Sequence, residues 1–376
     1  MRGLYVTTVD LEAGMEKNKA VNGREEIKAT NILKGIAIWF VIINHVGWIT
    51  EFDKRHFSLW IYVAVSIFVV ITGYHYALSM IGLEDVAIVN GFEESYTNNI
   101  LKWYSGKKFF KKILKVLVPY SIMFIIWLIY RKMITGNFLT GGISQTVSFF
   151  LRGGTGPGGY YTPVILQFLV IFPCFYFLIK KDRLKGAFLV LFLAIHYEFL
   201  RTVWNFSSEF YRIFFFRLAF ALTLGILLQK YYHLLKSTCI PHIMFMLGFI
   251  FLLGMSYLQY KPQTISSWTS TSYAAAPYAF SIVYFFLRQE NFFKRHSANW
   301  LIILMEYVGK ASYCIMLTQQ LYFTMGIERY FKPYVNNFVL CVIDIVLCTV
   351  VGVGFFRFSS WGTNWIFDNF YVRLKM

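Results

Sequence analysis

Long, continuously apolar segments recur along this chain, and they constrain its fold more than any other feature of the sequence. Each segment has about 20 residues, the length that a helix needs to cross the hydrocarbon core of a bilayer. The apolar residues do not alternate with polar ones, as they would in a membrane β-barrel. Hydrophobic residues make up 57% of the 376 residues, whereas soluble domains contain about 45–50%. We therefore expect an all-α integral membrane protein, with about ten transmembrane helices around a central cavity.

The expected spans divide the chain into one membrane domain and two polar ends. We assign residues 1–31 to a cytoplasmic N-terminal segment, 32–358 to the transmembrane domain and 359–376 to a cytoplasmic C-terminal tail. The N-terminal segment lacks the apolar stretch of a signal peptide, so we expect the first span to insert as an uncleaved anchor. The expected spans run roughly over residues 32–49, 58–80, 113–130, 160–179, 185–201, 212–229, 240–259, 271–288, 302–325 and 335–356.

The basic residues indicate a membrane topology and argue against a nucleic-acid partner. The formal net charge is +17, but Lys and Arg are spread over the short connections between apolar segments. Runs such as KKFFKKILK at 107–115 and KKDRLK at 180–185 alternate with connections that hold fewer positive charges. Cytoplasmic loops carry the excess of Lys and Arg in membrane proteins. We expect a multi-pass protein of the cell membrane, in contact with lipid and with both termini in the cytoplasm.

The five cysteines predict neither a disulfide framework nor a metal site. They lie mostly inside or beside the apolar segments, and no two of them form a Cys-x-x-Cys pair. We therefore expect no bound metal. Asp344 lies within the last expected span, where a carboxylate should have a partner or carry a proton.

Lys34 and His45 are the ionisable residues of the first apolar segment, ILKGIAIWFVIINHVGWIT at residues 32–50. Eleven residues of α-helix make about three turns, so the two side chains share one face and lie about 16 Å apart along the axis. Lys34 lies near the cytoplasmic end, where its amine can reach phosphates. An ionisable group as deep as His45 usually faces a cavity. The alternative is a histidine that hydrogen-bonds a neighbouring helix near the interface.

The same segment resembles the first span of acyltransferase family 3, a family of integral membrane O-acyltransferases that modify carbohydrates. In that family a basic residue is followed by ten residues and a histidine. Five further segments resemble those of the family in the same order, and the resemblance covers residues 32 to about 325. They are SIFVVITGYHYAL at 66–78, FFKKILKVLVPY at 109–120, GGYYTPVILQFLVIFP at 158–173, FFRLAFALTLGILL at 215–228 and GKASYCIMLTQQLYF at 309–323.

Two positions depart from the family pattern. Lys34 replaces the commoner Arg, which keeps a positive charge but loses the two-pronged geometry of a guanidinium. Gln319 stands where the family often has His, and an amide cannot exchange a proton near neutral pH.

The resemblance implies an acyl transfer and assigns roles to particular residues. The acyl group, expected to be acetyl, would pass from cytoplasmic acyl-CoA as co-substrate to a hydroxyl of an extracytoplasmic glycan or glycan precursor, with no permanently bound cofactor. His45 would act as general base or acyl relay, because imidazole titrates near neutral pH. Donor phosphates would bind to Lys34, Lys112, Lys115 and Arg217. The cavity and the carbohydrate acceptor would involve Thr72, Tyr74, Tyr160, Tyr161, His196, Glu198 and Gln319.

Other interpretations of these features stay open at the level of sequence. Tyr160 and Tyr161 are also typical of an interfacial aromatic belt, and His196 and Glu198 of a solvated helix end. A transporter or flippase for a polysaccharide or a lipid-linked sugar would suit the same spans, although it needs no acyl-CoA site. A catalytically silent relative is a third interpretation, because of Gln319. The glycine-rich stretch GGTGPGGY at 153–160 is expected to form a tight loop at the cavity mouth.

Overall fold

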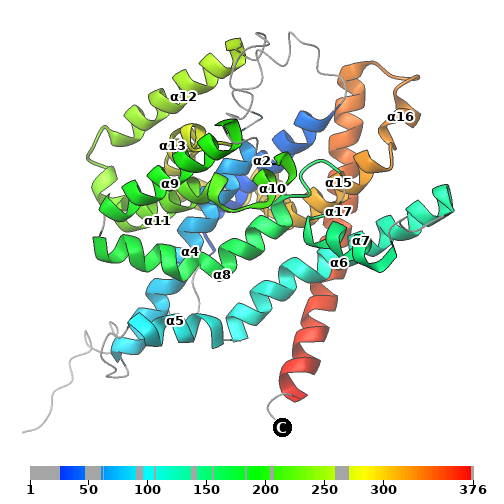
Figure 1. The fold of residues 1–376 in the computed structure, drawn as a ribbon. Helices are drawn as coiled ribbons and strands as arrows, with labels where there is room; N and C mark the ends of the chain where they lie inside the picture. Colours follow the sequence, from blue (N-terminus) through cyan, green and yellow to red (C-terminus); the bar gives the residue numbers. More distant parts are fainter. Residues whose placement is uncertain are drawn as a thin grey trace, which may run out of the picture.

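The computed structural model describes residues 26–46, 61, 63–89, 96–105, 107–136, 142–154, 156–182, 184–203, 207–258 and 271–373. In these ranges all regular secondary structure is helical (Figure 1). The helices are α2 (Lys28–His45), α4 (Ala64–Val89), α5 (Tyr96–Ser105), α6 (Lys107–Thr135), α7 (Gly142–Leu151), α8 (Tyr161–Asp182), α9 (Leu184–Val203), α10 (Ser208–Ile213), α11 (Phe216–Leu235), α12 (Ile240–Leu258), η1 (Tyr273–Ala275), α13 (Ala276–Arg288), α14 (Glu290–Arg295), α15 (Trp300–Thr324), α16 (Glu328–Phe331) and α17 (Asn337–Arg373).

Each expected span contains a helix, but the count of about ten membrane crossings is not confirmed. Within the described residues, six segments are long and apolar enough to cross a bilayer: Ala64–Glu84, Lys107–Thr135, Tyr161–Lys181, Phe210–Leu235, Trp300–Thr324 and Asn337–Asn369. The first expected span, α2, is not among them. Its 18 residues include Lys28, Thr30, Asn31 and Lys34, which lower its average apolar character.

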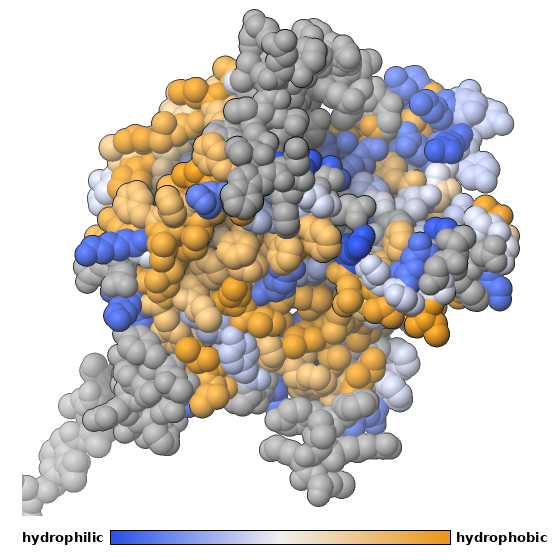
Figure 2. All heavy atoms as spheres, in the orientation of Figure 1, coloured by the Kyte–Doolittle hydropathy of each residue, from blue (hydrophilic) through white to orange (hydrophobic). Residues whose placement is uncertain are grey.

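The outer surface supports a multi-pass membrane protein. Apolar side chains cover much of the face shown in Figure 2. Many large hydrophobic residues are exposed on the outer helices, among them Ile129 of α6, Phe192 of α9, Ile250 of α12 and Val350 of α17. A water-soluble monomer rarely exposes an apolar area of this extent, so these helices have the surface of a protein that contacts lipid.

Two pairs of helices approach each other closely through glycines. A Cβ atom on Gly309 of α15 would lie 1.7 Å from the carbonyl oxygen of Asn31 in α2, and Gly35 of α2 faces the same crossing. Gly73 of α4 and Gly225 of α11 form a second contact of this kind. A Cβ atom built on Gly73 would lie 3.2 Å from Cα of Gly225, and one built on Gly225 would lie 3.0 Å from Cα of Gly73. Small residues at such crossings let helix backbones touch inside a membrane.

The structure shows the partner of Asp344 and the conformation of the chain after residue 358. Asp344 of α17 is fully buried and accepts a hydrogen bond of 2.5 Å from the hydroxyl of Tyr322 in α15. The part of the expected C-terminal tail that the structure describes is helical, because α17 continues unbroken to Arg373. Its 37 residues span about 55 Å. The expected N-terminal segment falls almost wholly outside the described residues.

Candidate functional site

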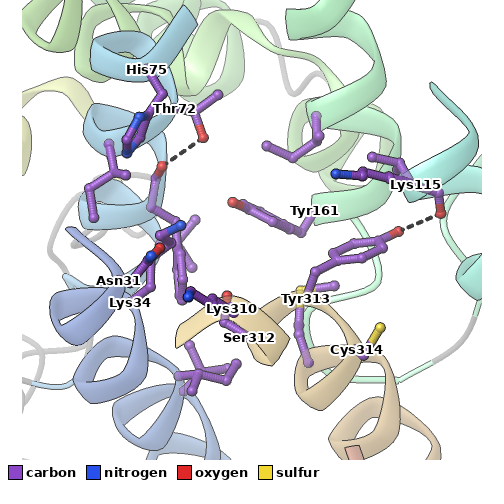
Figure 3. Close-up of a pocket in the computed structure, with 18 of the residues that line it drawn as sticks. Asn31, Lys34, Thr72, His75, Lys115, Tyr161, Lys310, Ser312, Tyr313 and Cys314 are labelled. Atoms are coloured by element: carbon purple, nitrogen blue, oxygen red, sulfur yellow. Dashed lines mark hydrogen bonds between the residues drawn. The ribbon is translucent and has the colours of Figure 1, made fainter. Parts of the chain in front are cut away.

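A cavity of about 1980 Å³ lies between helices α2, α4, α6, α8, α15 and α17 (Figure 3). It follows the whole length of α2: Glu26 and Ile27, just before the helix, line one end, and Asn44 and His45, at the end of the helix, line the other. The lining is mostly apolar and includes several polar and charged side chains. A large pocket with a few convergent polar groups is the usual form of a small-molecule site.

The geometry of α2 confirms that Lys34 and His45 share one face, because both side chains line this cavity. The imidazole of His45 lies 6.2 Å from the ring of Phe323, centroid to centroid, at the end of α15. Among the described residues, Lys34 has no carboxylate within ion-pair distance. The cavity therefore joins an ammonium group to an imidazole three helical turns away.

Lys34 is accompanied by three further lysines that line the cavity. Lys111 and Lys115 lie one turn apart on α6, and Lys310 comes from α15. Figure 3 shows Lys34 and Lys310 close together on one wall, and Lys115 on the opposite one. The sequence prediction included Lys115 but missed Lys310, although Lys310 is the second residue of the quoted segment GKASYCIMLTQQLYF. Only the crossing of α2 and α15 brings it beside Lys34.

The other two predicted donor-binding residues do not line the cavity. Lys112 follows Lys111 on α6, and its ammonium packs on the rings of Tyr76 and Trp103, at 4.6 and 4.1 Å from their centroids. Arg217, at the start of α11, is buried behind the wall. Its guanidinium lies 5.0 Å from the ring centroid of Tyr160 and donates a hydrogen bond to Thr271. Both groups are held by aromatic rings, as cations often are in proteins.

Three of the residues predicted to contact the acceptor line the cavity: Thr72, Tyr160 and Tyr161. The Thr72 hydroxyl donates to the carbonyl of Phe68 at 2.8 Å and also hydrogen-bonds with Tyr161. The ring of Tyr161 lies 6.1 Å from that of Phe68, near the start of α4. Thr72 and Tyr161 therefore form one polar group on the cavity wall.

The remaining predicted acceptor residues lie elsewhere, so the structure does not bring them to this cavity. Tyr74 is buried, two residues beyond Thr72 and so on another face of α4. His196 is exposed on α9 and stacks on Phe192, with ring centroids 5.7 Å apart. Glu198 is buried and accepts a 2.5 Å hydrogen bond from the Tyr211 hydroxyl.

Gln319 has a structural partner in the glycine-rich loop. Its side-chain amide donates to the carbonyl of Pro157 at 3.2 Å, and the amide of Gln320 donates to Gly153 at 3.0 Å. Gly153 has a φ of 90° and Gly158 a φ of 85°, which other residues rarely adopt. Because Gly158 lines the cavity, the loop borders it as the sequence predicted.

A second histidine, His75 of α4, lines the cavity and was missed by sequence reasoning. The hydroxyl of Thr30 donates its single proton to the carbonyl of Ile27 at 2.9 Å. The same hydroxyl lies 2.9 Å from His75 Nε2, so a hydrogen bond joins Thr30 to the imidazole. The signal was present in the sequence, since His75 belongs to the quoted segment SIFVVITGYHYAL.

Tyr313 of α15 is fixed between two helices at the cavity wall. Its hydroxyl lies 3.1 Å from the carbonyl of Val116 in α6 and 3.1 Å from the hydroxyl of Thr162 in α8. The tyrosine therefore ties α15 to both α6 and α8 beside the cavity, where Figure 3 shows its ring.

The described part of the chain offers no evident metal site. No cluster of three or more His, Cys, Asp or Glu side chains in these residues could hold a metal ion. The described side chains that line the cavity include ammonium, imidazole, hydroxyl and carboxylate groups.

Comparison with known proteins yields one match. The family model described as an acyltransferase domain, Acyl_transf_3, matches residues 27–357. The match begins one residue before α2, ends within α17 and so includes both ends of the cavity. No curated protein and no solved structure matches the chain.

Proposed function

The chain belongs to acyltransferase family 3, and we propose from this premise that it is a membrane O-acyltransferase that uses acyl-CoA. An acyl group, with acetyl as the favoured one, passes from cytoplasmic acyl-CoA to a hydroxyl of a glycan or glycan precursor outside the cytoplasm. One observation carries this proposal: a single cavity joins Lys34, in the first half of α2, to His45 at the end of this helix.

At the His45 end, the chemistry requires a base. His45 accepts the proton of the acceptor hydroxyl while the hydroxyl oxygen attacks the thioester carbonyl, and CoA leaves as a thiolate that takes up a proton. A positioned acid–base side chain contributes about 10²–10⁴-fold to such a step. Thr72, Tyr160 and Tyr161 line the same cavity, and their hydroxyls and rings suit a carbohydrate.

At the other end, the cavity offers positive charge for the phosphates of the donor. Lys34 and Lys115 line the cavity, and an ammonium group binds phosphate as a point charge. The donor then has to extend about 16 Å along α2 for its thioester to reach His45. In the proposed topology the Lys34 end opens to the cytoplasm, where acyl-CoA is available.

Release of CoA from labelled acetyl-CoA by the purified protein tests the proposal, with water as the acceptor. We expect His45→Ala to lower the rate about 10²–10⁴-fold while leaving the thermal unfolding temperature unchanged. His242→Ala provides a matched control, because His242 is exposed on α12 and does not line the cavity. Equal rates for the wild type and His45→Ala would refute the mechanism. A protein that moves a glycan across vesicles without releasing CoA would instead be a transporter.

A further inference from the structure

Lys310 is surrounded by carboxylates at the end of the cavity that also holds Lys34. Its ammonium nitrogen lies 2.5 Å from Oε2 of Glu26 and 2.9 Å from Oε1 of Glu306. Lys310, Lys34 and Glu26 all line the cavity. Lys310 thus meets two negative charges, whereas Lys34 beside it meets none within ion-pair distance among the described residues.

The two carboxylates around Lys310 are held very differently. Glu306 lies on α15 one turn from Lys310, its side chain is 17% exposed, and its second oxygen is 3.8 Å from the ammonium of Lys28. The side chain of Glu26 is 64% exposed and belongs to a residue that precedes α2. Exposed ion pairs are weak, at about 0.2–1 kcal/mol. Of the two carboxylates, Glu26 is therefore the one that can be displaced from Lys310.

Departure of Glu26 would not disturb the start of α2, because another carboxylate caps this helix. The backbone N–H groups of Lys28 and Ala29 donate to the two oxygens of Glu290 in α14, at 3.2 and 2.8 Å. A negative charge at a helix N-terminus satisfies otherwise unpaired donors and interacts favourably with the helix dipole. The fold of α2 therefore does not depend on Glu26.

We propose that Lys310 is a second phosphate-binding residue beside Lys34, and that Glu26 is its displaceable counter-ion. Before the donor binds, the carboxylate of Glu26 occupies the place of a donor phosphate. A phosphate group bound at Lys34 repels Glu26 and takes over its ion pair with Lys310, while Glu306 keeps its position. This inference rests on the proposed function, since it assumes a donor that carries phosphates.

The exchange of one anion for another has a consequence for turnover. Because Glu26 competes with the donor, it weakens binding of both acyl-CoA and the product CoA. The return of Glu26 to Lys310 then assists the release of CoA. Lys310 also keeps Glu26 as a counter-ion between turnovers.

Binding of CoA to the purified full-length protein tests this inference without any acceptor. We expect Glu26→Gln to tighten CoA binding by about 1.4- to fivefold, the range of an exposed ion pair. Lys310→Gln should weaken CoA binding, and the double variant should bind no more tightly than Lys310→Gln alone. Asp368→Asn is a matched control, because it removes one exposed carboxylate from the far part of α17, outside the cavity.

The outcomes separate this inference from the proposed function. Unchanged or weaker CoA binding by Glu26→Gln, with binding still dependent on Lys34, would overturn the role of Glu26 alone. That role would also be overturned if Glu26→Gln tightened binding equally in the Lys310→Gln background, or if Asp368→Asn tightened it as much. Absence of CoA binding by the wild type would overturn both proposals.

Discussion

A Cβ atom built on Gly309 would lie 1.7 Å from the carbonyl oxygen of Asn31, so α15 and α2 touch through their backbones. The contact precedes Lys310 by one residue and lies less than one turn from Lys34 along α2. The crossing therefore sets these two lysines beside each other on one wall of the cavity (Figure 3). Glycine is required here for space, since real Cβ atoms do not approach backbone oxygens this closely.

Replacing this glycine should push the two helices apart. We expect Gly309→Ala to lower the free energy of unfolding by about 1–3 kcal/mol, the usual cost of overpacking. Thermal unfolding in detergent, followed by tryptophan fluorescence, measures the change. Gly354→Ala in α17 is the matched control, because a Cβ there has no heavy atom within 4 Å. Equal unfolding temperatures for the two variants would show that the crossing tolerates a side chain.

Charge at position 34 should matter more than the shape of the side chain. We expect Lys34→Arg to keep near-normal kinetics and Lys34→Gln to raise the KM for acyl-CoA about tenfold or more, because a hydrogen bond to a charged group is lost. Steady-state kinetics with varied acyl-CoA separate KM from kcat. Lys185→Gln, an exposed lysine outside the cavity, serves as the control. A collapsed kcat with an unchanged KM would instead place Lys34 in the chemical step.

Arg217 offers a contrast, because the structure separates it from the lysines. Its guanidinium is held by Tyr160 and Thr271, and Tyr160 directly precedes α8, at the end that faces the start of α4. We therefore expect Arg217→Gln, which removes the positive charge as Lys34→Gln does, to leave the KM for acyl-CoA within about twofold of the wild type. A rise in this KM like that of Lys34→Gln would restore the donor-binding role that the sequence suggested.

Local helical geometry explains which site residues the sequence could identify. Lys34 and His45 belong to one helix, so their shared face follows from the helical repeat alone. The helical repeat alone could not show that Lys115 lines the cavity and that Lys112 does not. The repeat puts Lys111 and Lys115 on one face of α6, but only the packing of α5 decides that Lys112 meets Trp103.

Contacts between distant segments explain what the sequence could not show. Lys310 joins Lys34 through a helix crossing, and Glu26 joins Lys310 from near the other end of the chain. The assignment of residues beyond 358 to a tail likewise overlooked Ser359 and Thr363, which line the cavity from α17. Their polar side chains contribute to the cavity wall.

The side of the membrane that each end of the cavity faces is a prediction that cysteine labelling can test. The contact between His45 and Phe323 places the end of α15, and the connection that follows it, on the His45 side. Tyr334 is highly exposed in that connection. It is a better reporter than Thr155 of the predicted outer loop, which lies outside the described residues.

A reporter for the other side lies near the end of α8 that is on the Lys34 side of the molecule. The ion pair of 3.1 Å between Lys180 and Glu84 joins the end of α8 to the late part of α4, on the Lys34 side. Lys185 follows it and is exposed. A cysteine at this position therefore reports the side of the membrane to which the Lys34 end opens.

Single cysteines at Tyr334 and Lys185 then distinguish the two sides of the membrane. The background needs Cys174 and Cys239 changed to serine, because these are the exposed cysteines of the described residues. In intact cells we expect Tyr334→Cys to react with an impermeant maleimide and Lys185→Cys to react only after the cells are opened. The positive-inside distribution of lysines predicts this pattern. The reverse pattern would put the Lys34 end on the side away from acyl-CoA, and the transfer across the membrane would be refuted even though the family assignment would stand.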